Sequence, residues 1–154
     1  MTTIVEQFLA DNQIVEHDVV QGTPEWGNLR IDHDGASEAA EMLNIRPNRS
    51  KLLRIKALGL TKEFSQYVKE RILDQGHVKE TMARPIVEKQ IGRKLYPVTC
   101  SRGRMLSSSD GKTADGTILW EHKQYNAELF ASVQAGILPD EHWPQCQQGL
   151  LAHG

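Results

Sequence analysis

The residues best suited to chemistry lie in one stretch of the chain, Ser107-Ser-Ser-Asp110-Gly-Lys-Thr-Ala-Asp-Gly-Thr-Ile-Leu-Trp-Glu121-His-Lys123. We predict a short strand that ends at Asp110, a glycine-rich loop, and a second strand that ends in Glu-x-Lys. Because side chains alternate faces along a strand, Glu121 and Lys123 should point one way and His122 the other. Carboxylate oxygens suit a hard divalent ion such as Mg²⁺, and a lysine beside that ion can orient or deprotonate a water molecule. The pattern therefore indicates metal-assisted phosphodiester hydrolysis.

Each of these residues also has an ordinary structural interpretation. Asp-Gly is among the commonest turn pairs, so Asp110 could be a turn residue only. Glu121 and Lys123 could be a solvent-facing pair on a strand. The alternation of side chains by itself does not choose between the two interpretations.

The composition is that of an ordinary soluble globular protein. The 154 residues, 39% hydrophobic and 25% charged, fit a single domain over residues 1–154. The apolar runs are too short to span a membrane, and the amino-terminal residues lack the basic and apolar regions of a secretory signal. Cys100 and Cys146 are the only cysteines, which favours a reducing cytoplasm and excludes a four-thiolate iron–sulfur cluster. The six histidines form no zinc-binding pattern.

Charge is distributed unevenly along the chain. Residues 1–45 hold nine acids and one base, Arg30, whereas residues 46–112 hold sixteen bases and six acids. Residues 113–154 hold five acids and one base, Lys123. A lone base in an acidic stretch suits one local task. The acid-free segment 46–62 could follow a phosphate backbone or be a solvated basic face. Its bases are Arg46, Arg49, Lys51, Arg54, Lys56 and Lys62.

Local patterns predict the elements that must position these residues. We expect helices and helical turns at 24–30, from Ser37 as N-cap to about Asn44, and at 62–74, 77–91, 126–135 and 142–151. We expect strands at 14–20, 96–101, 104–109 and 117–123. Pro85 should kink or split the helix at 77–91. The predicted fold class is α+β, with a mostly antiparallel three-stranded meander at about 96–123 flanked by helices.

Four motifs spread over about residues 20–154 add a family resemblance. They are Trp26-x3-Arg30-x6-Ser37-Glu-Ala, Gly76-x3-Glu80-x2-Ala83, Ser109-Asp110-Gly111 followed by Glu121-His-Lys123, and Gln145-Cys-Gln147 before Leu150-Leu151 and Gly154. In this order and spacing they resemble the lambda exonuclease and viral-type recombinase family of the PD-(D/E)XK nuclease superfamily. The resemblance implies a restriction-endonuclease-like core.

The resemblance also implies a metal site. Asp110 and Glu121 would be ligands of Mg²⁺, for which Mn²⁺ would substitute. The backbone carbonyl of His122 would be a further ligand. Glu80 would join the same site from its helix, directly or through water.

Further roles follow from the same likeness. Lys123 would orient the attacking water, and Gln145 would help position the lysine or the scissile phosphate. Arg30 and Ser37 would bind a terminal 5′-phosphate of DNA, and an arginine beside a serine at a helix start suits such an anion. The implied activity is 5′-to-3′ hydrolysis of double-stranded DNA in phage-type recombination, in the cytoplasm of a bacterium or of a phage-infected host.

Other interpretations remain open at this stage. Glu80 could be a helix-surface acid, and Arg30 could pair with Asp32 or Asp34. Ser37 could be only an N-cap, Gln145 a plain polar helix position, and Trp26 a packing residue. The chain could instead be an endonuclease of the same superfamily, or a catalytically inactive DNA-binding module.

The chain departs from the family pattern at three points. Ser109 replaces the proline before the metal-binding aspartate, and Pro85 interrupts the helix of Glu80. The family continues beyond the glutamine helix with further strands and a helix, so the chain is expected to be a fragment or a reduced version. Members of the family form homotrimers and act with a single-strand annealing protein, which makes both of these expected partners.

Overall fold

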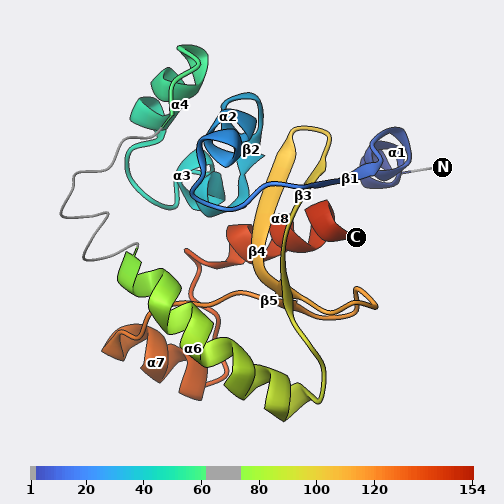
Figure 1. Ribbon diagram of the computed structural model, residues 1–154. Coiled ribbons are helices and arrows are strands. Elements are labelled where there is room, and N and C mark those ends of the chain that lie inside the picture. Colours follow the sequence, from blue (N-terminus) through green and yellow to red (C-terminus); the bar gives the residue numbers. More distant parts are fainter. Residues whose placement is uncertain (1–2, 62–73) are drawn as a thin grey trace.

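The computed structural model describes residues 3–61 and 74–154 of the chain (Figure 1). In the described residues, seven α-helices and a 3₁₀ turn accompany a mostly antiparallel five-stranded open sheet, which confirms the predicted α+β class. The elements are α1 (Ile4–Asp11), β1 (Ile14–His17), α2 (Pro24–Asp32), β2 (Asp34–Gly35), η1 (Ala36–Glu38), α3 (Ala39–Met42), α4 (Arg49–Ala57), α6 (Asp74–Ile91), β3 (Tyr96–Arg102), β4 (Met105–Lys112), β5 (Leu119–Trp120), α7 (Ala127–Gln134) and α8 (Trp143–His153).

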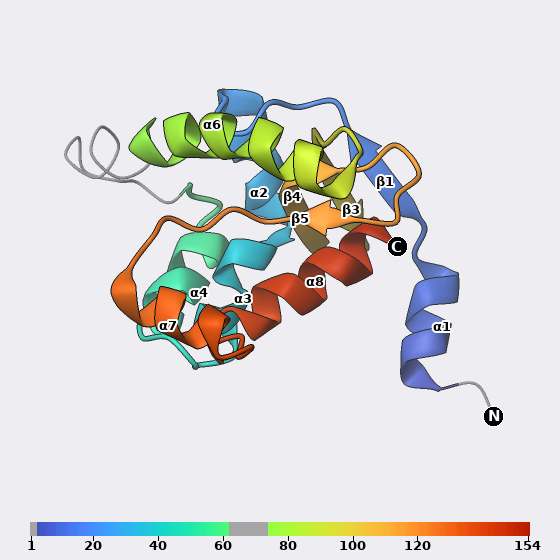
Figure 2. The same cartoon turned by 90° about the horizontal axis from the view of Figure 1, so that it is seen from below.

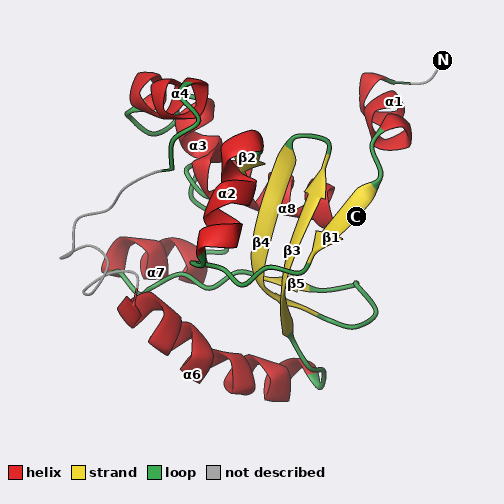
Figure 3. Cartoon of the chain, turned by 45° about the horizontal axis from the view of Figure 1, so that its top comes forward, coloured by secondary structure: helices red, strands yellow, loops and turns green. Residues whose placement is uncertain are grey.

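The sheet is built around the β3–β4 hairpin, which Figure 3 shows at the centre of the fold. Its turn contains Gly103, whose φ of +56° lies in the left-handed region that glycine adopts readily. β1 pairs antiparallel with β3, and β5 pairs antiparallel with β4. The two-residue strand β2 runs parallel to β4, with Gly35 opposite Leu106. This pairing holds α2 and η1 beside the start of β4.

Helix α8 covers one face of the β3–β4 hairpin and also packs against η1 and α3. Figure 2 shows α6 on the opposite side of the central strands. The side chains of Cys100, Leu106 and Ala152 are almost fully buried between the hairpin and α8. Leu52 of α4 is equally buried. The sheet thus lies between two helical layers, and residues from both layers can reach the end of β4.

The meander matches its prediction in part. β4 continues through Asp110 to Lys112, so the prediction that a loop starts at Asp110 is wrong. The reason is that Gly111 and Lys112 pair with β5. The third strand, expected at 117–123, spans only Leu119–Trp120. The residues before it are tied into the loop, where the Ile118 N–H donates to Thr113 Oγ1 at 3.1 Å.

Two helix predictions are also corrected. Ser37 is not an N-cap, because it lies inside the 3₁₀ turn η1, and Gly35 is the capping residue. The Glu38 carboxylate takes the capping role by accepting the Gly35 N–H at 3.2 Å. A kink or a split was expected at Pro85, and the split is wrong, because helix α6 runs through Pro85 without a break. Proline removes one donor, and the helix on both sides of it is long enough to continue.

The remaining helix predictions hold with shifted ends. The turn at 24–30 is the helix α2, with Pro24 at its first position and Thr23 as N-cap. The predicted strand at 14–20 ends at His17. The helix expected at 62–74 lies outside the described residues except for its last position. No helix in the described part of the chain is long and apolar enough to cross a bilayer.

Candidate active site

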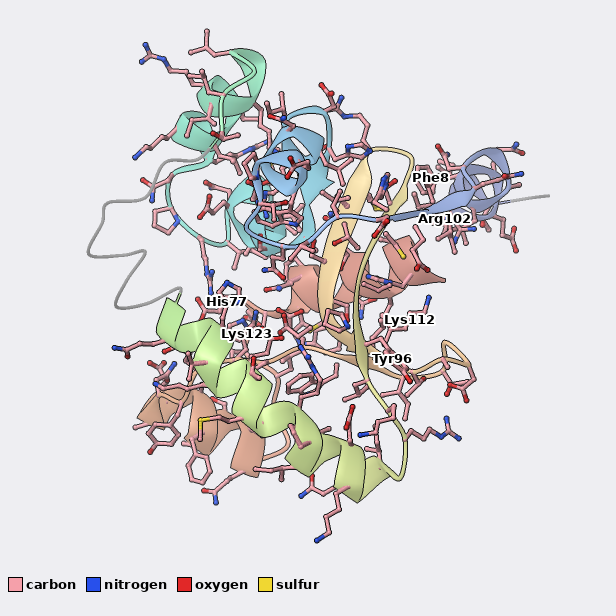
Figure 4. The ribbon with its side chains drawn as sticks, viewed as in Figure 1. Phe8, His77, Tyr96, Arg102, Lys112 and Lys123 are labelled. Carbon is pink, nitrogen blue, oxygen red and sulfur yellow. The ribbon has the colours of Figure 1, made fainter. Side chains whose placement is uncertain are left out.

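A pocket of about 260 Å³ lies where α2, η1, the start of α6, the end of β4, the segment after β5 and α8 meet. All eight residues that the sequence analysis singled out line this pocket. They are Arg30, Ser37, Glu80, Asp110, Glu121, His122, Lys123 and Gln145. In Figure 4, Lys123 and His77 lie together near the amino-terminal end of α6. Residues from five separate parts of the sequence therefore share one cavity.

The pocket has two chemically different ends. We call Glu80, Asp110, Glu121, Lys123 and Gln145 the acidic end. We call Trp26, Arg30, Ser37, Glu38 and Lys56 the arginine end, although Glu38 and Lys56 stand behind the pocket wall rather than in it.

A closed set of hydrogen bonds fixes the lysine of the acidic end. Lys123 Nζ donates to Glu121 Oε1 at 2.7 Å and to Gln145 Oε1 at 2.9 Å. Gln145 Nε2 donates to the same Glu121 oxygen at 2.5 Å. Glu121 and Lys123 therefore point the same way, although both lie after the end of β5, so strand alternation is not the cause. Gln145 comes from α8, so this helix sets the position of the ammonium group.

Asp110 is held by the backbone on both sides of it. Its Oδ2 accepts the N–H of His122 at 2.6 Å, which joins β4 to the segment after β5. The Ser109 hydroxyl lies 2.9 Å from the carbonyl oxygen of Gly111 and 3.2 Å from that of Trp120. These two contacts of Ser109 fix the strand end that carries Asp110.

Glu80 reaches the pocket from α6, and its side chain is only 14% exposed. It forms an ion pair with Arg84, one turn further along the helix, and its Oε2 lies 3.7 Å from Nδ1 of His77. Glu80 is therefore not an ordinary surface acid. Because Glu80 and Asp110 line the same pocket, the proline at position 85 does not turn this carboxylate away from Asp110.

The carboxylates of the acidic end lie close enough to influence one another. Burial raises the pKa of Asp110 above its ordinary value, the His122 N–H opposes this, and the Glu80 charge adds to it. Burial also raises the pKa of Glu121, Lys123 opposes this, and the Asp110 charge adds to it. Both shifts mean that the negative form of each carboxylate lacks sufficient positive compensation in the protein alone.

The donor set at this end suits a hard divalent cation. It consists of the carboxylate oxygens of Glu80, Asp110 and Glu121, and such oxygens are the ligands that Mg²⁺ prefers. One oxygen of Asp110 and one of Glu121 have no hydrogen-bond partner among the described residues. A cation would also relieve the repulsion that raises the pKa of both carboxylates. No group of three or more histidine, cysteine, aspartate or glutamate side chains in the described residues is already gathered at metal-binding separation.

Arg30 dominates the arginine end. Its Nη2 lies 2.6 Å from Glu38 Oε1, and its Nη1 donates to Ser37 Oγ at 3.4 Å. The guanidinium carbon lies 4.7 Å from the centre of the Trp26 ring. Trp26 in turn donates from Nε1 to Ser108 of β4 at 2.7 Å. Trp26 is therefore a packing residue, as one interpretation held, and it also supports the guanidinium.

Glu38 was not among the site residues predicted from the sequence. The expected partners of Arg30 were Asp32 and Asp34, but the structure pairs it with Glu38, which is 4% exposed. Glu38 also forms an ion pair with a second cation, because Lys56 Nζ lies 2.9 Å from Glu38 Oε2. One feature of the sequence could have indicated a buried ion pair of Arg30. Arg30 is the single base of residues 1–45 and directly precedes a cluster of acids.

The basic segment 46–62 is not one continuous solvated stripe. Lys56 is turned inward, with its side chain 11% exposed. Arg46 forms an ion pair with Glu141 at 2.9 Å. Arg49, Lys51 and Arg54 are exposed on α4, and Lys62 lies outside the described residues.

Comparison with known proteins gives no relative for this chain, because no family model and no curated protein matches it.

Proposed function

We propose that this protein is a Mg²⁺-dependent deoxyribonuclease that removes nucleotides from the 5′ ends of duplex DNA. The observation that carries the proposal is the shared pocket, with buried or half-buried carboxylates and a hydrogen-bonded lysine at one end and an ion-paired arginine at the other. The motif resemblance to the lambda exonuclease and viral-type recombinase family supports the same assignment.

The acidic end would hold the metal ion. Asp110, Glu121 and the backbone carbonyl of His122 would be the ligands, and Glu80 would contribute directly or through water. When bound, Mg²⁺ offsets charge that develops on the phosphate and lowers the pKa of a water molecule. Mn²⁺ has similar ligand preferences and would substitute.

Lys123 would act on the attacking water. Its ammonium group is held by Glu121 and Gln145, so its N–H groups keep one direction. An ammonium has three donors, and two of them are engaged in these bonds, which leaves one for a water molecule. Glu121 and Gln145 would thus position the lysine, and Lys123 would orient the nucleophile toward the phosphorus atom.

The arginine end would hold the terminal phosphate. Arg30 has a planar guanidinium with five donors, a geometry that fits phosphate oxygens, and Ser37 adds a hydroxyl beside it. Anchoring of the 5′ end would direct hydrolysis to the bond that follows it. The strand that remains, with a 3′ overhang, would suit recombination by single-strand annealing.

The test measures cleavage of internally labelled linear duplex with 5′-phosphate ends by the purified protein in Mg²⁺. We expect nucleotide release that stops in excess EDTA and that is lost in Asp110→Asn and Lys123→Met. The matched controls are Asp140→Asn and Lys89→Met, which alter exposed residues outside the pocket and should retain full activity.

Equal cleavage by the wild type, Asp110→Asn and Lys123→Met would refute the assignment. Closed circular duplex DNA separates the exonuclease from an endonuclease of the same superfamily, because an exonuclease leaves it intact. Absence of cleavage together with carboxylate-independent binding of DNA would identify an inactive binding module.

A further inference from the structure

Glu38 joins two cations behind the pocket wall. Its Oε1 pairs with Arg30, and its Oε2 lies 2.9 Å from Lys56 Nζ and 3.2 Å from the Gly35 nitrogen. The side chain of Glu38 is only 5% exposed, and that of Lys56 only 11%. One carboxylate therefore serves two positively charged groups in a place that water barely reaches.

Lys56 is held in this position by further bonds. Besides Glu38, its Nζ donates to the carbonyl oxygens of Arg30 at 2.7 Å and of His33 at 2.5 Å. These three acceptors match the three N–H donors of an ammonium group. Lys56 does not line the pocket itself. It can therefore influence a ligand only through Glu38 and Arg30.

The second cation on Glu38 changes the net charge of this group of residues. A guanidinium paired with a single buried carboxylate forms a neutral unit that attracts an anion weakly. With Lys56 on the other carboxylate oxygen, the unit of Arg30, Glu38 and Lys56 carries a net charge of plus one. The guanidinium thereby keeps both its fixed position and an excess of positive charge.

We propose that Lys56 is a positioning residue that keeps Arg30 competent to bind a terminal phosphate, by sharing the Glu38 carboxylate with it. This inference rests on the proposed function, since the phosphate in question is the 5′ end of the DNA substrate. It gives Lys56 of the basic segment 46–62 a role at the substrate end rather than along the backbone.

The experiment measures binding without cleavage. Fluorescence anisotropy in EDTA gives the Kd for a blunt duplex oligonucleotide with a 5′-phosphate and for the same duplex with a 5′-hydroxyl. The ratio of the two Kd values is the phosphate preference. In Lys56→Met the unit becomes neutral, and we expect the preference to fall by about tenfold. Lys51→Met, at an exposed position on the same helix, should leave the preference unchanged.

The double variant Glu38→Gln with Lys56→Met distinguishes charge balance from simple structural damage. It removes one negative and one positive charge, so the net charge of plus one returns, and the amide oxygen introduced at position 38 can still accept from Arg30. We expect its phosphate preference to recover toward that of the wild type. Damage to the fold would instead make the double variant worse than Lys56→Met.

An unchanged preference in Lys56→Met, or no recovery in the double variant, would overturn the inference. If Lys56→Met does not fold, as judged by circular dichroism, the double variant decides alone: a preference near that of the wild type supports the inference, and a ratio of one refutes it. Equal binding of both duplexes by the wild type would instead show that the proposed phosphate anchoring is wrong. Failure of the inference alone therefore remains distinguishable, because the wild type would still prefer the 5′-phosphate.

Discussion

The pKa values of the carboxylates are shifted in opposite directions at the two ends of the pocket. At the arginine end, burial pushes the pKa of Glu38 upward, but Arg30 and Lys56 outweigh it, and the pKa lies below its ordinary value. At the acidic end, burial raises the pKa of Asp110 and Glu121, and the nearby positive charge does not compensate. The same residue types therefore contribute to stability at one end and oppose it at the other.

This difference separates a carboxylate whose charge the protein itself compensates from two carboxylates whose charge it compensates only in part. Glu38 has two cations and a backbone N–H, so its charge is satisfied by the protein itself. Asp110 and Glu121 share one lysine, and they repel each other. Buried groups whose pKa is raised in a pocket are typical of functional sites. A bound cation would complete the acidic end in the way that Arg30 and Lys56 complete the arginine end.

The largest expected effect separates chemistry from binding at the two ends. Lys123→Met should lower kcat by about a hundredfold to a thousandfold, because the water loses its orienting group, and it should change KM little. Arg30→Gln should mainly raise KM for 5′-phosphorylated duplex, because the anchor is weakened. Steady-state kinetics on linear duplex DNA measure both quantities.

Lys89→Met and Arg49→Gln are the matched controls, since both residues are exposed and lie outside the pocket. Neither should change kcat. If Lys123→Met raised KM and left kcat intact, the assignment of chemistry to the acidic end would be wrong.

The next effect concerns the stability of the arginine end. Glu38→Gln leaves Arg30 and Lys56 as buried cations without their counter-charge, and we expect a loss of about 3 kcal/mol in the free energy of unfolding at pH 7. Because the folded pKa of Glu38 lies below its ordinary value of 4.5, its contribution is fully present above pH 4.5. The contribution should disappear as the pH falls through the folded pKa. Urea unfolding at pH 7 and at pH 3 measures the change, and a loss of equal size at both would contradict the explanation.

The acidic end should respond in the opposite direction. A carboxyl with a raised pKa stabilises the fold below its ordinary value, 3.8 for Asp110, and this advantage is lost as the pH rises through the folded pKa. Asp110→Asn should therefore raise the free energy of unfolding by about 1 kcal/mol at pH 7, since the amide oxygen can still accept the His122 N–H. Thermal unfolding measures this gain.

The effect of Mg²⁺ on the Tm provides a second test of Asp110. The ion should raise the Tm of the wild type and have a much smaller effect on Asp110→Asn, because binding to the folded state alone stabilises it. Asp140→Asn should behave like the wild type in both measurements. A Tm of Asp110→Asn below that of the wild type in EDTA would show that the carboxylate is already satisfied.

The sequence predicted which residues line the pocket better than it predicted the ion pairs that hold those residues in place. The closeness of Asp110, Glu121 and Lys123 could be predicted from the sequence, because a hairpin brings the ends of its two strands together. Gln145 joined them only through the family resemblance, since nothing in its local pattern says that α8 packs against the β3–β4 hairpin.

The role of Glu38 could not be predicted from the chain, and the reason is physical. Residues 1–45 contain nine acids, and burial selects one of them through long-range packing that local patterns do not reveal. Lys56 is separated from Glu38 by α3, a turn and most of α4, so no helical or strand periodicity links the two. The extent of β5 was overestimated for a similar reason, because Asp115 and its hydrogen bonds to Thr117 hold the preceding residues in the loop.

The smallest expected effect concerns a glycine at the arginine end. A Cβ at Gly35 would lie 3.0 Å from Arg30 Nη2 and 3.2 Å from Glu38 Oε2, closer than most carbon contacts in proteins. The backbone at Gly35 has φ of −73°, which alanine adopts without strain. Gly35→Ala should therefore act by displacing the guanidinium and not by bending the chain.

We expect Gly35→Ala to reduce the preference for 5′-phosphorylated over 5′-hydroxyl duplex by about threefold, because a shift of a few tenths of an ångström weakens a hydrogen bond without removing it. The Mg²⁺-dependent rise in Tm should stay intact, since the acidic end is not touched. Gly27→Ala in α2 is the matched control, because its Cβ would meet only a methyl group of Thr61 at 3.7 Å. If Gly35→Ala altered the response to Mg²⁺ as strongly as the phosphate preference, the two ends of the pocket would not be separable units, and the contrast between Glu38 and Asp110 would have to be explained by the pocket as a whole.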